Sequence, residues 1–335
     1  MAVKKGPIGN LLSKKYGRIA FITTPTYRKS SYQSLCFFVY KYMYALCNSF
    51  LVMTTGGTYD AVIKIIDRPY GSLTSADLSN IMFGFPFKIA KDADLQPWRD
   101  VIRSGLQRTP PRFKGMIHIT YELIEGRLDA VIHLTEWQDK SAKADSAVLS
   151  REANVHNIPI ATDIDTAEAF IKTWNALIAN QMRGSSIFRK RVGPSNPPLA
   201  GIKSKHNVLA MVAHDNMKLE MCKFAVKNAQ YIFKNYDYIL ATGTTGSWIK
   251  QFMEAIGRSP ADIKKIRCCN SGPWGGDIQI AYAVVEGLCQ KCIFLQDPSV
   301  SHPHDSDIKL FEQAVVSNGV HVKLATNVDS ASLLI

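Results

Sequence analysis

The stretch YILATGTTGSWIKQF (Tyr238–Phe252) joins an apolar run to a cluster of threonines and glycines, after which a helical pattern begins at once. Such a junction predicts a buried strand followed by the first turn of a helix, where backbone N–H groups are unpaired and the helix dipole is positive. Threonine hydroxyls add hydrogen-bond donors, and glycines let a ligand approach the backbone closely. The stretch therefore favours either a phosphate-binding loop or a tight turn with a threonine cap.

The same alternation of short apolar runs and helical patterns extends along the chain. VLAMV, YIL and CIFL are continuous apolar runs, typical of strands covered on both faces. Segments 219–234 and 278–286 show helical spacing. Alternation of this kind predicts parallel β-α-β units whose ligands bind at the carboxyl ends of the strands. The predicted fold class is α/β, with two tandem three-layer, Rossmann-type domains, each a mainly parallel central sheet flanked by helices.

Segments of the first half recur in the same order in the second half. GMIHITYELIEGRLDAVIHL (115–134), for example, matches GDIQIAYAVVEGLCQKCIFL (276–295) in its spaced Ile, Tyr, Glu and Gly. The offset between matched residues falls from 187 at the threonine cluster to 161 here, so the first copy carries 26 additional residues. The predicted organisation is a basic flexible tail (1–16), a first domain (17–181) with a surface insertion near 67–114, a linker (182–205) and a second domain (206–335).

Composition excludes several classes of protein. The 335 residues are 46% hydrophobic and 20% charged, which is a globular composition. The net charge of +12 lies mostly in the first half, but no nucleic-acid recognition motif accompanies it, so nucleic acid is not an expected partner. Seven cysteines are too irregular for a disulfide framework, and the pair Cys289 and Cys292 is expected to be buried and reduced rather than zinc-bound.

Two segments bear on localisation. The start of the chain lacks the apolar core of a signal peptide, although its basic, acid-free composition also suits a transit peptide. The apolar segment Ser34–Met53 is long enough to span a membrane, but Lys41, Asn48 and several tyrosines interrupt it. A buried helix followed by a buried strand explains it equally well. We therefore expect a cytoplasmic protein without a membrane segment.

Four motifs in the second half carry a family resemblance. VAHDNMK, ATGTTG, SGPWGGDIQI and QDPSVSHPHDSD occur in this order within about 207–327, and together they resemble methylglyoxal synthase. The resemblance implies an α/β fold with a parallel sheet, a hexameric assembly and no metal or cofactor. It also implies conversion of dihydroxyacetone phosphate to methylglyoxal and inorganic phosphate, with phosphate as product and candidate inhibitor.

That reaction needs residues of the types present. A carbon next to a ketone must lose a proton before phosphate leaves, which requires a carboxylate base and an electrophile at the oxygens. By resemblance Asp277 is the base, and His304 polarises or shuttles protons between the substrate oxygens. Asp297 could equally cap the following helix. The catalytic residues implied by the resemblance are Asp277, His304, Asp307, His214, Asp215 and Asp297.

The opening stretch acquires a role from the same resemblance. Its threonines would bond phosphate oxygens through hydroxyl and backbone donors, while a lysine supplies charge. The implied phosphate-binding residues are Lys218, Thr242, Gly243, Thr244, Thr245, Ser271 and Gly272. The family also uses an arginine from a C-terminal extension, and here we expect Arg183, Arg189 or Arg191 to supply that charge.

The first copy departs from the motifs. At the positions of Asp277 and His304 it has Met116 and Lys143, so it is expected to be inactive and to serve assembly or regulation. If the hexamer is preserved, three two-domain chains form a homo-oligomer with three active domains. The alternative function is a catalytically inactive protein that binds phosphorylated metabolites. That alternative resembles the allosteric domain of carbamoyl-phosphate synthetase and a domain of the bifunctional purine enzyme with IMP cyclohydrolase activity.

Overall fold

The chain folds into two compact units. The computed structural model describes residues 16–110, 113–136, 144–179, 197–297, 299, 305–315 and 322–335. The first unit is formed by the described residues of 1–146 and 153–192, and the second by those of 147–152 and 193–335. The basic tail before residue 16, most of the predicted linker, and Arg183, Arg189 and Arg191 lie outside the described residues.

The first unit is built on a parallel sheet of five strands in the order β3-β2-β1-β4-β5. Its strands are β1 (Gly17–Thr23), β2 (Phe50–Thr54), β3 (Leu106–Arg108), β4 (Ala130–Leu134) and β5 (Ile160–Ala161). Its helices are α1 (Pro25–Ser30), α2 (Tyr32–Phe38), the π-helix η2 (Val39–Met43), α3 (Tyr44–Ser49), α4 (Gly56–Ile66), the 3₁₀ turn η3 (Tyr70–Ser72), α5 (Ser75–Gly84), α6 (Asp92–Gly105), α7 (Phe113–Ile124) and α10 (Ile164–Ala179). Helix α9 (Ala144–Val155) is divided, because its residues 147–152 are assigned to the second unit. Every residue of β4 is buried, as a strand covered on both faces requires.

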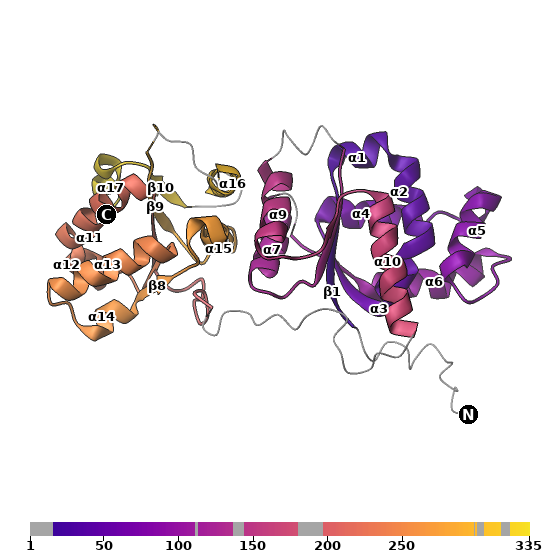
Figure 1. Ribbon diagram of the computed structural model, residues 1–335, viewed down its shortest axis with the longest axis horizontal. Coiled ribbons are helices and arrows are strands. Elements are labelled where there is room, and N and C mark those ends of the chain that lie inside the picture. Colours follow the sequence, from indigo (N-terminus) through magenta and orange to yellow (C-terminus); the bar gives the residue numbers. More distant parts are fainter. Residues whose placement is uncertain are drawn as a thin grey trace, which may run out of the picture. The chain divides into compact units, whose positions relative to one another are not determined.

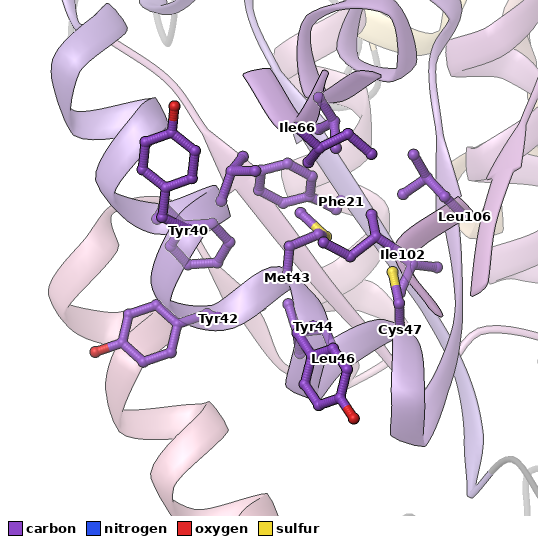
Figure 2. Close-up of a cluster of buried hydrophobic side chains, with 14 of the residues drawn as sticks. Phe21, Tyr40, Tyr42, Met43, Tyr44, Leu46, Cys47, Ile66, Ile102 and Leu106 are labelled. Carbon is purple, nitrogen blue, oxygen red and sulfur yellow. The ribbon is translucent and has the colours of Figure 1, made fainter. Parts of the chain in front are cut away.

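The core of this unit includes both the apolar segment and part of the predicted insertion. The segment 34–53 forms helical turns that lead into β2, as predicted. In the described part of the chain, no helix is both long enough and apolar enough to cross a membrane. Figure 2 shows Met43 of η2 and Phe21 of β1 among the buried side chains, with Ile102 of α6 and Leu106 of β3.

The prediction of a surface insertion near 67–114 is therefore wrong for its second half. Trp98 of α6 is 1% exposed, and β3 pairs with β2 at the edge of the sheet. The apolar residues of α6 recur at helical spacing on one face, which buries that face against α3 and β2. The prediction of a surface segment came from the proline and charged residues of α6, which alternate in sequence with its buried apolar residues.

The second unit repeats the architecture with the strand order β10-β9-β6-β7-β8, again all parallel. Its strands are β6 (Val208–Ala213), β7 (Tyr238–Ala241), β8 (Ile266–Cys268), β9 (Lys291–Leu295) and β10 (Lys323–Ala325). Its helices are the 3₁₀ turn η4 (Asp215–Met217), α11 (Lys218–Lys227), α12 (Ala229–Asn235), α13 (Gly243–Ala255), α14 (Pro260–Lys264), the 3₁₀ turn η5 (Gly272–Trp274), α15 (Gly276–Val285), α16 (Asp305–Val315) and α17 (Val328–Leu334). Helices α11–α14 and α17 cover one face of this sheet, and α15 and α16 cover the other (Figure 1).

The two sheets confirm the predicted fold class. Read in the opposite direction, the second sheet has the order β8-β7-β6-β9-β10, so β6, β7, β8, β9 and β10 occupy the places of β1, β2, β3, β4 and β5. One detail differs from the sequence pattern, because the helix expected over 219–234 is two helices. The break lies at Asn228, whose side chain donates a hydrogen bond to the Phe224 carbonyl at the end of α11.

Candidate active site

A cavity of about 300 Å³ opens at the carboxyl end of the second sheet, where parallel α/β sheets bind their ligands. Most of the residues predicted for the site line it. They are His214, Asp215, Lys218, Thr242, Thr244, Ser271, Gly272 and Asp277. They come from the ends of three neighbouring segments that are far apart in sequence. The sheet topology, with β7 between β6 and β8, is what brings these segments together.

The threonine cluster begins helix α13. Thr242 is the N-cap residue, with extended backbone (φ −63°, ψ 151°), and its hydroxyl donates to Oγ1 of Thr245 at 3.2 Å. Thr245 is fully buried, whereas Thr244 is exposed and faces the cavity. The first turn of a helix presents N–H groups and a positive dipole end, so this end of α13 suits an anionic group.

The loop that carries Ser271 and Gly272 is fastened to the start of α13. The N–H of Gly243 donates to the carbonyl of Asn270 at 2.9 Å, so this N–H is used inside the protein, and Gly243 does not line the cavity. The N–H of Asn270 in turn donates to Oε1 of the fully buried Gln279 at 2.7 Å. One chain of hydrogen bonds thus fixes the Ser271–Gly272 loop relative to the start of α13. We call these two segments together the phosphate cradle.

Close backbone packing explains the paired glycines before Asp277. A Cβ on Gly276 would lie 1.9 Å from the Asn270 carbonyl oxygen, so only glycine fits there. Gly275 has φ 86°, in the left-handed region that glycine adopts without strain. Together they turn the chain from η5 into α15 and place Asp277 in the first turn of that helix.

Asp277 is the buried carboxylate of the cavity. Its side chain is 5% exposed, and burial raises its pKa from 3.8 to about 7. A carboxylate with a pKa near neutrality is a stronger base than an exposed one and is still partly ionised at pH 7. It faces the same cavity as the threonine cluster, so one small ligand can reach both.

A lysine supplies positive charge to the cavity. Lys218 is the first residue of α11, and its ammonium donates to the carboxylate of Asp215 at 2.5 Å. The side chain of Asp215 is 87% exposed, whereas that of Lys218 is 13% exposed. The pair orients the lysine toward the cavity while leaving its other donors available for an anion.

His214 is held in one orientation by a backbone bond. Its Nδ1 accepts from the N–H of Asp297 at 2.9 Å, and its ring packs edge-on to Phe294 at 5.0 Å between centroids. A neutral imidazole that accepts at Nδ1 carries its proton on Nε2, so His214 serves as a hydrogen-bond donor at that nitrogen.

Asp297 lies beside the cavity rather than in its lining. Its carboxylate accepts from the N–H and hydroxyl of Ser299 and from the Asn216 amide, and these hydrogen bonds lower its pKa to about 2. Such a carboxylate is a poor base at neutral pH. Its observed contacts are those of a residue that fixes the loop and, through its own N–H, the ring of His214.

Asp307 and His304 belong to the segment that leads into α16. Asp307 is fully buried on α16, which packs against α15. Burial raises its pKa, and the nearby carboxylate of Asp277 raises it further. Asp307 does not line the cavity. His304 lies outside the described residues.

Some residues of the site were missed by sequence reasoning. Pro273 and Phe294 line the cavity, and Gln279 anchors its loop from behind. Pro273 and Gln279 lie within the motif SGPWGGDIQI, and Phe294 lies in the apolar run CIFL. Their position within those motifs could have pointed to these residues. The partner of Gln279, however, becomes apparent only in the folded unit, because it is a single glutamine in an apolar helix.

The first unit keeps part of this arrangement. Thr55 is the N-cap residue of α4, and its hydroxyl lies 3.0 Å from that of Thr58, as Thr242 and Thr245 do in the second unit. Arg28 takes the sequence position of Lys218 and bonds the carbonyl and hydroxyl of Thr23. Where the second unit has Asp277, however, the first has the buried apolar residue Met116.

Comparison with known proteins agrees with these features. No protein-family model matches the chain. The methylglyoxal synthase of Cupriavidus pinatubonensis is 38% identical over 128 residues, covering 38% of this chain and 88% of that protein. The methylglyoxal synthase of Thermus thermophilus is 39% identical over 127 residues, covering 38% of this chain and 90% of that protein. A solved methylglyoxal synthase from Elizabethkingia anophelis matches with 30% identity and a TM-score of 0.32, covering 38% of this chain and 76% of that one.

Each of these matches is the length of one unit, and the curated relatives are matched over most of their own length. On sequence identity over that length, and with a cavity formed by the residues that carry the resemblance, this chain belongs to the methylglyoxal synthase family.

Proposed function

We propose that the second unit converts dihydroxyacetone phosphate to methylglyoxal and inorganic phosphate. The observation that carries this proposal is a single cavity in which a buried carboxylate, Asp277, faces a helix start and a lysine suited to a phosphate group. The relatives named methylglyoxal synthase support the same reaction class.

In the proposed reaction Asp277 takes a proton from the hydroxymethyl carbon of the substrate, and the electron pair moves into an enediolate. The neutral His214 ring donates a hydrogen bond from Nε2 to the developing oxyanion, with His304 moving protons between the two substrate oxygens. A buried, water-poor position strengthens such electrostatic contacts. Burial keeps the pKa of Asp277 near neutrality, at about 7.

Loss of phosphate completes the proposed reaction. The bond between the substrate carbon and the phosphate oxygen breaks, inorganic phosphate leaves, and the remaining enol rearranges to methylglyoxal. Thr242, Thr244, Ser271 and the N–H groups of α13 would hydrogen-bond the phosphate oxygens, and Lys218 would offset their charge. Because charge on the phosphate grows as the bond breaks, these contacts favour its departure.

The test is to incubate the full chain with dihydroxyacetone phosphate and follow methylglyoxal and phosphate separately, with glyceraldehyde 3-phosphate as an alternative substrate. We expect the two products in equal amounts from dihydroxyacetone phosphate. Asp277→Asn should lower kcat by about 10²- to 10⁴-fold, the usual contribution of a general base. Asp329→Asn, which changes an exposed carboxylate on α17, is the matched control. Phosphate release without methylglyoxal would refute the proposed reaction.

A specific observation favours a second function for the first unit, namely binding of a phosphorylated ligand without turnover. Arg28 lies against Gly57 in the first turn of α4, with its Nη2 2.8 Å from the position a Cβ would take there. Its position brings a cation to the positive end of a helix, and an anion between them would relieve that repulsion. Equilibrium dialysis of Asp277→Asn with dihydroxyacetone phosphate should detect a site that is lost when Arg28→Gln is added; equal numbers of sites with and without Arg28→Gln would exclude this function.

We also propose that the two units arose by duplication of one ancestral domain. Their strand orders coincide, and their matching sequence segments occur in the same order. Under this proposal the boundaries 17–181 and 206–335 mark the two copies. Assembly of the chain as a homo-oligomer would preserve the family's arrangement with half of its sites active.

A further inference from the structure

The second unit carries another concavity at the opposite edge of its sheet. It has a volume of about 330 Å³ and lies where β7 and β8 begin, whereas the candidate active site lies beyond their carboxyl ends. Tyr238 opens β7 and lines it, together with Arg267 of β8 and the end of α14. None of the residues that line this concavity takes part in the proposed reaction.

The lining is rich in cations that lack acidic partners. Lys264, Lys265 and Arg267 all face the concavity, and within the described residues none of them forms an ion pair. The two nearby carboxylates are engaged elsewhere. Asp262 pairs with Arg258 at 2.9 Å. Asp237 accepts from the N–H of Asn207 at 2.8 Å but also lines the concavity, so it offsets part of the charge of the three cations.

The three cations differ in what they can still bind. Lys265 is already satisfied by the carbonyls of Phe233 and Tyr236, at 2.6 and 3.1 Å. Arg267 stacks on Tyr238 at 5.3 Å, and its Nε is fully enclosed without a hydrogen-bond partner among the described residues. The enclosed Nε is out of reach of a ligand, so a ligand would accept from the terminal N–H groups of this half-buried arginine.

A histidine completes the set of donors. The Nδ1 of His206 accepts from the N–H of Lys203 at 3.0 Å, so its remaining proton is on Nε2. Its ring packs edge-on against Tyr238 at 5.2 Å, so this tyrosine holds both the histidine and the arginine in place. Fixed donors on a common aromatic support favour a compact anion over a flexible chain of charges.

A hollow at the same edge of the first sheet, beside the starts of β1 and β2, is neutralised by acidic side chains. Arg18 and Arg127 line this hollow, and both are paired with Glu122, at 3.1 and 2.7 Å. Asp129 lines the same hollow and adds a further negative charge. Acidic side chains thus offset the arginines of that hollow, whereas Asp237 is the carboxylate that faces three cations in the concavity of the second unit.

We propose that the concavity formed by His206, Tyr238, Lys264 and Arg267 binds a small multiply charged oxyanion, a phosphate or the phosphate group of a small metabolite. Arg267 and His206 would each donate to its oxygens, and Lys264 would add charge from the rim. Three charge-assisted contacts of this kind correspond to a Kd on the order of 1 mM. This site does not depend on the proposed reaction, because the two cavities share no residue.

The experiment observes His206 directly, so that phosphate bound in the candidate active site does not confuse it. The full chain, labelled with ¹³C at histidine Cε1, is titrated with inorganic phosphate at constant pH and ionic strength. The His206 signal is identified by its loss in His206→Gln. We expect a saturable shift with a Kd of about 1 mM, weakened about tenfold in Arg267→Gln and in Lys264→Gln.

Lys227→Gln is the matched control, because it removes one exposed lysine of α11 away from the concavity and should leave the titration unchanged. Lys264 is itself exposed, so its substitution tests the site even if Arg267→Gln does not fold. The proposal is overturned if the shift is linear in phosphate, if sodium chloride reproduces it, or if Lys264→Gln and Lys227→Gln behave alike.

Discussion

Replacing Asp277 by asparagine should stabilise the second unit while it abolishes turnover. Burial raises the pKa of this carboxyl from 3.8 to about 7, so its ionised form is disfavoured in the native state. A shift of roughly 3 pKa units corresponds to about 4 kcal/mol, at 1.36 kcal/mol per unit. At pH 8 the native carboxylate carries this full cost, and asparagine, which has the shape of the protonated acid, does not.

The raised pKa of Asp277 also determines how the stability of the second unit depends on pH. Because the native pKa lies above the unfolded value, Asp277 stabilises the native state below about pH 4, and this contribution is lost as the pH rises through 7. The wild type should therefore lose about 4 kcal/mol relative to Asp277→Asn between pH 4 and pH 8. Asp277 also raises the pKa of Asp307, so the difference between the two proteins reports on Asp277 together with its interaction with Asp307.

Hydrogen–deuterium exchange of peptides from β6 and β9 measures this difference in the second unit alone, because these buried strands exchange through opening of that unit. Exchange at pH 4 and pH 8 is compared after correction for the intrinsic rates. Asp329→Asn, at an exposed site in the first turn of α17, should change the opening free energy by less than about 1 kcal/mol. An equal pH dependence in wild type and Asp277→Asn would refute the assignment of a buried, proton-binding carboxyl.

Three further outcomes follow from the site. The kcat/KM for dihydroxyacetone phosphate should rise with pH and level off above about 7, because Asp277 must be ionised to accept a proton; a profile flat from pH 5 to 8 would contradict this. Lys218→Gln should raise KM by about 10- to 100-fold through loss of a charge-assisted bond of about 1.5–3 kcal/mol, and an unchanged KM would exclude a contact of Lys218 with the phosphate. Gly276→Ala should lower the melting temperature of the second unit and its phosphate affinity, because the new Cβ meets the Asn270 carbonyl. Gly71→Ala should change neither, because no atom lies within 4 Å of its new Cβ. Similar behaviour of the two variants would refute the packing argument.

Sequence reasoning located the ends of the strands well because each buried strand is an apolar run that ends in polar or small residues. The threonine cluster could be placed at such an end, after YILA, and it directly follows β7 in the structure. The parallel topology then brings such strand ends together without further information. This is why most of the predicted residues line one cavity.

Other features depend on contacts that leave no local pattern. The helix expected over 219–234 is broken at Asn228, where a side-chain bond to a carbonyl ends α11 although the apolar spacing continues. Helix α6 was missed because Pro97 and its charges outweighed the apolar face that packs into the core. Gln279 could not be assigned a role because its partner, the N–H of Asn270, approaches it only in the folded unit.

The most direct test of the proposed reaction is to compare turnover of dihydroxyacetone phosphate by the wild type, Asp277→Asn and Met116→Ala. These two substitutions occupy equivalent positions in the two units, so one experiment asks which unit contains the base. We expect the wild type and Met116→Ala each to release methylglyoxal and phosphate in equal amounts. Asp277→Asn should release neither product at a comparable rate. Full activity in Asp277→Asn, or its loss only in Met116→Ala, would contradict the assignment of the base to the second unit.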